Sequence, residues 1–252
     1  MRSVLMVNIR SMDDLPKMER WIQKDHFPEG VMSFGPGISR YMSYRVVPPP
    51  KGMYDDVEKF GYHNWRVTEF WWAQGQVPFA AGLGPRWKSK DMPDYDDIVT
   101  SMSRCSVPFV PAQDFKGKGL TMDDPPMLRW LIFMKYPAGV SFEEGEEWYL
   151  NVHSKEVIQQ DGLTRYFSSP ALKGPVRPGD KAPFVRLVEQ WYPGFNSWNK
   201  SVIDSPPQYT KPKWAKYDKY PFLEPGVDFV STFILEKPTN DNLRDQLGYI
   251  PG

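Results

Sequence analysis

Two of the three histidines in this 252-residue chain recur in matching surroundings. His26 follows Trp21 by five residues, and His153 follows Trp148 by the same spacing. An imidazole titrates near neutrality, so it can take up and release a proton at physiological pH. The alternative is a structural role, in which the ring bonds the last carbonyl groups of a helix. Because the pattern occurs twice, we predict catalytic histidines, with His26 as the preferred centre and His153 as its counterpart.

Tyrosines at two further matching places could hold an oxygen atom of a substrate. Tyr41 follows Arg40, and Tyr166 follows Arg165, within segments that read as β-strands. Adjacent strand residues point to opposite faces, so only one member of each pair can face a given pocket. A phenol can donate a hydrogen bond to a developing oxyanion, although core packing is the alternative role. Tyr44 shares a face with Arg40 and adds a second phenol.

Glu69 and Glu189 lie centrally in apolar strands. A buried carboxylate is costly unless it is paired or functional. A structural ion pair with Arg40 or Arg165 and an acid that binds substrate or takes part in catalysis are both open. His63 precedes Glu69 by six residues and shares its face, so His63, Glu69 and Trp71 are expected to cluster. The candidate residues are then, for catalysis, His26, Tyr41, His63, Glu69 and His153, and, for substrate binding, Tyr44, Trp71, Tyr166, Glu189 and Trp191.

These residues are carried by two similar halves of the chain. The fragments RVTEFWW at 66–72 and RLVEQWY at 186–192 align without a gap. We also match PFVPAQDF at 108–115 with PFLEPGVDF at 221–229. A repeat of this length indicates two fused domains rather than a solenoid. The predicted domains are residues 1–120 and 121–252, joined by a linker at 117–126.

Each half shows the same order of predicted elements. The period of apolar residues, the turn residues and the capping residues all contribute to this assignment. Expected strands lie at 4–9, 38–47, 63–72 and near 115, then at 128–134, 164–168, 184–192 and 229–235; expected helices lie at about 11–25, 94–104, 141–152 and 195–203. The first helix should end before Pro28, which cannot continue it. Each half therefore reads as βαββαβ, a four-stranded antiparallel sheet with one bare face. The predicted fold class is α+β, with two tandem ferredoxin-like repeats packed sheet to sheet as an α+β barrel.

The composition excludes several classes of function. Lysine plus arginine equals aspartate plus glutamate, 31 against 31, which gives no reason to expect nucleic acid or membranes as partners. The basic and aromatic stretch KPKWAKYDKYPF at 211–222 is interpreted as a solvated loop. One cysteine, no secretory signal and no long apolar run favour a soluble cytoplasmic protein. No nucleotide loop, metal-binding motif or hydrolase elbow is present, so we expect no cofactor and no metal.

The motifs around the two histidines resemble the EthD-type branch of the dimeric α+β barrel superfamily. The first copy is WIQKDHFPEG followed by PGISRY, and the second is WYLNVHSKEV followed by GLTRY. Pro28 matches the His-x-Pro pattern of that family, whereas Lys155 departs from it in the second copy. The resemblance implies a pocket between the sheet and helices of each unit. It also implies one of several activities, among them cofactor-free monooxygenases, polyketide cyclases, lactone isomerases, dehydratases, hydroxynitrile lyases and haem enzymes.

The leading hypothesis is a cofactor-independent enzyme that uses histidine acid/base chemistry on an aromatic or polyketide-like small molecule. The reaction would be that of a lyase, dehydratase, cyclase or isomerase. His26 would move the proton, Tyr41 or Tyr44 would hold the oxygen, and Glu69 or His63 would orient the base. A cofactor-free monooxygenase and a non-catalytic binder of hydrophobic metabolites are the alternatives. A homodimer is also open, since two fused units can still pair through their outer faces.

Overall fold

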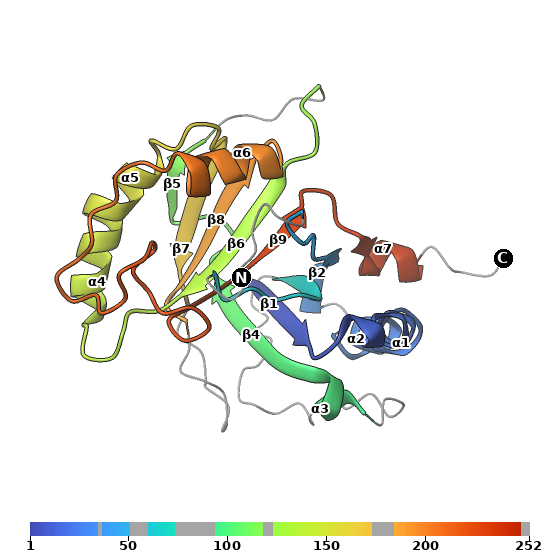
Figure 1. Cartoon of the computed structure of the whole chain (residues 1–252). Helices are drawn as coiled ribbons and strands as arrows, with labels where there is room; N and C mark the ends of the chain where they lie inside the picture. The colour runs from blue at the N-terminus through green and yellow to red at the C-terminus, as the bar shows by residue number, and fades with distance from the viewer. Residues whose placement is uncertain (35–36, 51–59, 74–93, 118–122, 173–183, 248–252) are drawn as a thin grey trace.

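Two five-stranded antiparallel sheets form the centre of the protein in the computed structural model, which describes residues 1–34, 37–50, 60–73, 94–117, 123–172 and 184–247. The strand order is β10-β2-β3-β1-β4 in the first sheet and β5-β7-β8-β6-β9 in the second. Figure 1 labels β1, β2 and β4 of the first sheet and all strands of the second. The strands are β1 Arg2–Ile9, β2 Ile38–Arg45, β3 Arg66–Trp72, β4 Val99–Val107, β5 Gln113–Lys116, β6 Leu128–Met134, β7 Arg165–Pro170, β8 Arg186–Tyr192, β9 Phe229–Leu235 and β10 Asn240–Asp241. The predicted α+β fold is confirmed.

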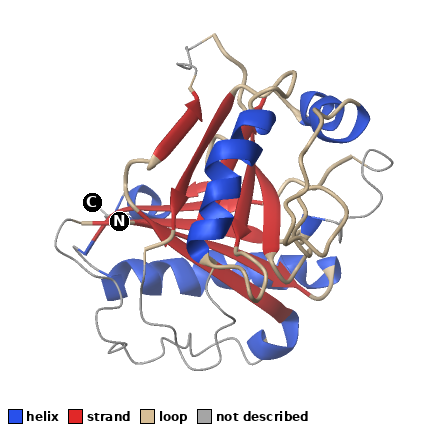
Figure 2. Ribbon diagram, turned by 90° about the vertical axis from the view of Figure 1, so that its left-hand side faces the viewer, coloured by secondary structure: helices blue, strands red, loops and turns tan. Residues whose placement is uncertain are grey.

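The two sheets close into a barrel with the helices outside. The amide of Val47, just after β2, donates to the carbonyl of Phe233 in β9 at 2.8 Å. The amide of Leu172, just after β7, donates to the carbonyl of Ser106 in β4 at 2.7 Å. Apolar residues of both sheets fill the space between them, including Val4 and Leu131. Helices cover the outer faces, so each half also has its own core between sheet and helix (Figure 2).

The last strand of each half belongs to the other half's sheet. β5 pairs with β7, and β10 pairs with β2. Consequently β4 is the counterpart of β9, and the match of 108–115 with 221–229 is wrong; these two segments also differ by one residue in length. The helix predicted at 94–104 is limited to α3, Tyr95–Ile98. Its remaining residues form β4, because pairing along β1 provides backbone partners that local propensity does not reveal.

A π-helical turn carries each of the two matching histidines. In the first half, α1 Leu15–Trp21 leads into the turn Ile22–His26 and then into α2 Phe27–Phe34. In the second half, α4 Phe142–Trp148 leads into the turn Tyr149–His153 and then into α5 Ser154–Val157. The prediction that the first helix ends before Pro28 is wrong. The π turn closes at Phe27, and Pro28 falls in the first turn of α2, where its missing amide hydrogen is tolerated. Such π turns are frequent at functional sites.

The remaining helices lie in the second half and at its end. Helix α6 Phe195–Asn199 continues as the π-helical turn Lys200–Asp204, as predicted for 195–203. Helix α7 Asn242–Leu247 follows β10 and lies over the first half, near α2 and β2 (Figure 1). Among the described residues, no helix is long and apolar enough to cross a membrane.

Gly61 lies where the barrel closes, and we expect it to resist substitution. Its φ is 55°, and a Cβ there would lie 2.5 Å from the Phe229 carbonyl oxygen and 2.8 Å from the Gly226 nitrogen. Since these are backbone atoms, they cannot rotate away. We expect Gly61→Ala to lower the free energy of unfolding by about 2 kcal/mol. Gly139→Ala is the control, because its φ is 93° but nothing lies within 4 Å of the added carbon. Equal losses for both variants in urea unfolding would contradict this assignment.

Candidate active site

The structure places the predicted site residues on two different faces of the sheets. Glu69 and Trp71 of β3 point into the barrel, where Tyr44 also lies. Tyr41 points to the helix side, where it packs with the core that includes Trp21 and Phe27. Neighbouring strand residues alternate between faces, so Glu69 and the His26-bearing turn lie on opposite sides of the first sheet. The hypothesis that Glu69 orients His26 is therefore wrong.

Glu69 and Glu189 belong to a buried quartet of charges inside the barrel. Arg129 Nη2 lies 2.9 Å from Glu69 and 2.8 Å from Glu189, and Arg2 Nη2 lies 2.6 Å from Glu69. Arg2 also bonds Glu189. Burial alone would raise the pKa of Glu189, but the two guanidinium groups outweigh it and lower that pKa to about 2. The carboxylates are thus structural ion pairs, with Arg2 and Arg129 as partners rather than Arg40 and Arg165.

The two arginines expected to pair with the glutamates stack on tryptophans instead, and Arg40 is exposed. Arg40 lies over the ring of Trp71 at 5.9 Å, and Arg165 lies over Trp191 at 4.9 Å. His63 is buried at the seam, with Nε2 3.2 Å from the Ser103 hydroxyl. His63 thus contacts β4, whereas Glu69 is held by Arg2 and Arg129, and Trp71 packs against Arg2.

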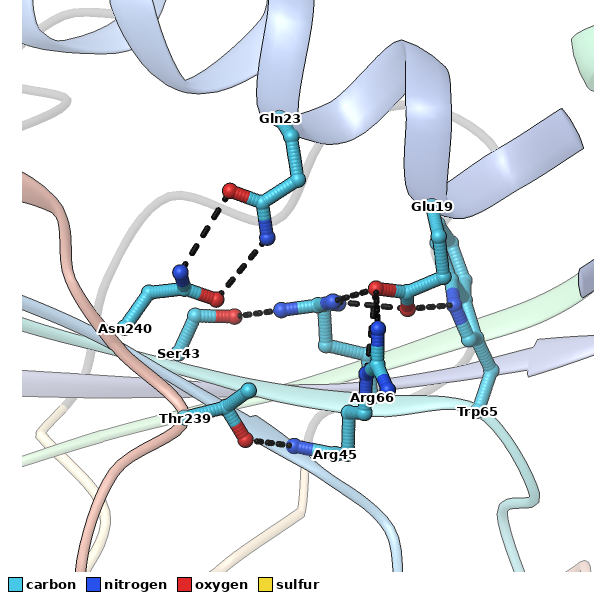
Figure 3. Close-up of polar contacts among 8 residues, drawn as sticks. All are labelled: Glu19, Gln23, Ser43, Arg45, Trp65, Arg66, Thr239 and Asn240. Carbon is cyan, nitrogen blue, oxygen red and sulfur yellow. Dashed lines mark hydrogen bonds and ion pairs between the residues drawn. The ribbon is translucent and has the colours of Figure 1, made fainter. Parts of the chain in front are cut away.

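A second polar cluster, between helix and sheet, was missed by the sequence analysis. Arg66 bonds both carboxylate oxygens of Glu19 at 2.7 and 2.6 Å, and the Trp65 indole donates to Glu19 at 3.1 Å (Figure 3). In the second half, Arg186 bonds Glu146 in the same way. Each glutamate precedes its tryptophan, Trp21 or Trp148, by two residues, and this repeated spacing could have revealed the pair. The duplication indicates a structural role, fastening helix to sheet.

The segment before α7 fastens to the same region of the first half. Gln23, in the first π turn, and Asn240 exchange two hydrogen bonds of 2.9 and 3.3 Å (Figure 3). The Thr239 hydroxyl accepts from the Arg45 amide at 2.8 Å. Residues from the end of the chain therefore hold the helix that carries His26.

The two histidines occupy chambers of different composition. His26 lies against Trp21 with ring centres 4.6 Å apart, and the neighbouring core is apolar, with Phe70 stacked on Tyr41. His153 lies against Trp148 at 4.7 Å and against Tyr220 at 5.7 Å, with the Tyr220 ring nearly parallel to it. Where β3 has Phe70 and Trp72, β8 has Gln190 and Tyr192. The second chamber therefore contains polar groups that the first lacks.

A cavity opens in this second chamber. Its empty space is about 370 Å³, including the part open to solvent, and its lining side chains must move apart to admit an aromatic ligand. It is lined by Trp130, Ile132, Met134, Trp148, Tyr149, His153, Val188, Gln190, Tyr220, Pro221, Leu223 and Phe229. None of these side chains carries a formal charge apart from the titratable imidazole. Among the described residues, His153 Nδ1 has no hydrogen-bond partner although it is buried. Such an atom in a cavity wall is available to a ligand.

Five buried or half-buried side chains beside the cavity form a ring of polar contacts. The single hydrogen of the Tyr192 hydroxyl is donated either to Gln160 Oε1, at 2.5 Å, or to Gln190 Oε1, at 2.6 Å. Gln160 Nε2 donates to the Tyr209 hydroxyl at 2.8 Å. Tyr220 completes the ring through hydrogen bonds with Tyr209 and Gln190. The segment at 211–222, interpreted as a solvated loop, thus contributes a cavity wall, and that interpretation is wrong for Tyr220, Pro221 and Phe222.

Both imidazoles are neutral at physiological pH. Burial lowers the pKa of His153 to about 3. Burial, together with the positive charge of Arg66, lowers the pKa of His26 to about 3. The expectation that these groups titrate near neutrality is therefore corrected. A neutral imidazole has one donor and one acceptor nitrogen, so each ring can still accept a proton.

Phenols surround the second imidazole. The Tyr166 hydroxyl donates to that of Tyr149 at 2.8 Å, and Tyr149 packs beside His153 at 5.6 Å. Tyr166 itself is fully buried and, like Tyr41, serves the core. Burial raises the pKa of Tyr149, Tyr166 and Tyr220, so these hydroxyls keep their hydrogens. Within the described residues, no group of three histidine, cysteine or acidic side chains is arranged to hold a metal ion.

Comparison with known proteins finds one family model and several solved structures that resemble this chain. Residues 1–88 match the family model described as the chalcone isomerase N-terminal domain. An anthrone oxidase-like protein of known structure is 10% identical, with 95% of this chain and 91% of that chain covered and a TM-score of 0.50. A protein provisionally named a chlorite dismutase is 13% identical, with 99% and 98% covered and a TM-score of 0.38. No curated protein matches the chain. At 10% identity, the likeness to the anthrone oxidase-like protein concerns the fold alone.

Proposed function

We propose that this chain is an isomerase-type enzyme that moves a proton within an aromatic small molecule, at the second-half cavity and with His153 as the base. The observation that carries the proposal is the buried Nδ1 of His153, without a hydrogen-bond partner in the described structure, in the wall of an aromatic cavity. A site with a convergent polar group in an apolar cavity is the arrangement expected for small-molecule chemistry.

The divergence of the two chambers favours the second one. Gln190 and Tyr192 replace Phe70 and Trp72 at equivalent positions of β8 and β3. Burying an amide and a phenol costs free energy unless each is hydrogen-bonded, and an apolar core would serve stability as well or better. The polar ring beside His153 is therefore best explained by a function. The alternative location is the first chamber, because the family match covers residues 1–88 and so includes His26.

A neutral imidazole with a lowered pKa can still act as the base in this setting. The pKa of His153 is low because burial disfavours the charged imidazolium form. When the ring takes a proton from a substrate, the substrate becomes the anion beside it. Opposite charges attract strongly where water is excluded, so the ion pair stabilises the protonated ring. Return of the proton to another atom of the same molecule completes an isomerisation without any external reagent.

The family description suggests a first substrate for assay. Chalcones are flat, uncharged aromatic ketones, and a 2′-hydroxychalcone can be followed by the loss of its conjugated absorbance. We expect His153→Ala to lower kcat/KM by about 100-fold, the usual contribution of a general base. His26→Ala is the matched control and should change kcat/KM less than threefold, about 0.7 kcal/mol. A larger loss of kcat/KM in His26→Ala than in His153→Ala would place the reaction in the first half. Full activity of both variants would show that neither histidine takes part in the mechanism.

Dioxygen dependence separates this proposal from the cofactor-free monooxygenase hypothesis. Proton transfer within one molecule consumes no oxidant, so we expect the same rate in anaerobic buffer. A rate that falls to the uncatalysed value without oxygen would instead support an oxygenase in the same cavity.

A further inference from the structure

The ligand of the second-half cavity must meet a wall that has hydrogen-bonding groups but no fixed charge. The cavity wall contains the imidazole of His153 and the amide of Gln190. Tyr220 brings a phenol into the same wall. We infer that this site takes an uncharged, flat molecule with a hydrogen-bond-accepting oxygen, and that Tyr220 donates to that oxygen. This inference deepens the proposed function and rests on the same cavity.

The hydrogen-bonded ring allows Tyr220 to turn its hydrogen toward a ligand at little cost. Tyr209 accepts a hydrogen bond from Gln160 at 2.8 Å and shares another with Tyr220. Either phenol of that pair can be the donor, because a hydroxyl hydrogen rotates to suit its partners. If Tyr209 donates to Tyr220, the hydrogen of Tyr220 is released from the ring. No heavy atom of this pair has to move, so Tyr209 keeps its hydrogen bonds with Gln160 and Tyr220 while Tyr220 contacts the ligand.

The stacking around His153 selects a flat molecule. Tyr220 is nearly parallel to the His153 ring, at an interplanar angle of 21°, and Trp148 lies on another side at 36°. Tyr209 stacks on Tyr220 with ring centres 4.0 Å apart, which holds the Tyr220 ring in place. Aromatic walls of this kind bind planar, apolar surfaces and place polar atoms at the edges of the ring.

The electrostatics of the chamber exclude an anionic ligand. Arg186 lies beside this chamber, over the ring of Tyr149 at 4.5 Å, but it is already paired with Glu146. A carboxylate in the cavity would lose its hydration without gaining a counter-charge, and such a transfer costs several kcal/mol. An oxygen of a ketone or ether has no such penalty.

Three probes of the same ring system test the inference by equilibrium binding, measured as quenching of tryptophan fluorescence. 2-Acetylnaphthalene offers an acceptor oxygen, 2-ethylnaphthalene lacks it, and 2-naphthoate is an anion. We expect the ketone to bind about tenfold more tightly than the hydrocarbon, as for one net hydrogen bond, and the anion to bind most weakly. Equal affinity for ketone and hydrocarbon, tighter binding of the anion, or binding of none of the three would overturn the inference.

Substitutions assign the donor and separate this inference from the proposed reaction. Tyr220→Phe should remove the tenfold preference for the ketone while leaving the hydrocarbon's affinity within twofold. Gln190→Phe, which copies Phe70 of the first chamber, should weaken both neutral probes by reducing the cavity. Tyr95→Phe, a phenol of the first half, is the control and should keep the preference. A preference retained in Tyr220→Phe would refute the role of Tyr220, even if His153→Ala abolishes turnover. Conversely, Tyr220→Phe could lose the preference while His153→Ala keeps full turnover. That result would refute the proposed reaction but not the proposed binding site.

Discussion

Replacing Glu189 with leucine should lower the free energy of unfolding by about 3–5 kcal/mol, the largest stability loss that we expect from a single substitution in this protein. Glu189 is 1% exposed and bonds both Arg2 and Arg129. Without it, two buried guanidinium groups share the single carboxylate of Glu69. The loss therefore comes from uncompensated positive charge rather than from missing attraction. Urea unfolding at neutral pH measures it.

A double variant distinguishes this cause from a simple loss of contacts. Arg2→Met together with Glu189→Leu restores neutrality, because Arg129 and Glu69 remain as one pair. We expect the double variant to be more stable than Glu189→Leu alone by at least about 1 kcal/mol. If the two substitutions instead add their separate losses, uncompensated charge is not the cause. Glu143→Gln, at an exposed position of α4, provides the control for the removal of a surface carboxylate.

The second large effect should appear in mildly acidic solution. The pKa values of His26 and His153 are lowered to about 3 in the folded protein, mainly by burial, whereas an unfolded histidine titrates near 6.5. Below pH 6.5 the unfolded chain therefore binds protons that the folded chain does not. Folding stability is complete above that pH and falls as the pH is lowered toward 3. At pH 5 we expect a loss of about 2 kcal/mol for each histidine relative to pH 7.

Variants with asparagine at these positions provide the comparison. Asparagine is polar and does not titrate, so each substitution should remove its own share of the difference in stability between pH 7 and pH 5. Those two pH values lie above the pKa of Glu189 in the folded protein, so its carboxylate stays charged at both. An unchanged pH dependence in the double variant His26→Asn, His153→Asn would show that neither imidazole is held neutral.

The sequence was sufficient to predict the two βαββ units and their packing, because apolar periodicity and the repeated Trp-to-His spacing are local signals. The exchange of edge strands could not be predicted. β5 has four residues and β10 has two, and both are stabilised by partners in the other half. The same reason hid Arg2 and Arg129, which contact glutamates across the barrel. One amino-acid sequence contains no direct signal of contacts between residues that are so far apart along the chain.

For the candidate site, the sequence identified the two histidines but not the chamber that surrounds the second one. The sequence does contain one signal of this chamber. In the gap-free alignment of 66–72 with 186–192, Gln190 stands opposite Phe70, and a buried amide in a strand requires partners. The partners themselves, Tyr209 and Tyr220, come from an irregular segment without periodicity, so their position depends on tertiary packing alone.

Covalent fusion of the two units has a consequence for how their pockets can evolve. In a homodimer with the same architecture, every substitution enters both pockets at once, so a residue that improves one must be tolerated in the other. Here Phe70 and Gln190 are encoded separately and can vary independently. Strands β5 and β10, each paired in the sheet of the other half, still hold the two units together. One unit can then keep a tightly packed core, and its stability can compensate for a less stable, specialised pocket in the other unit.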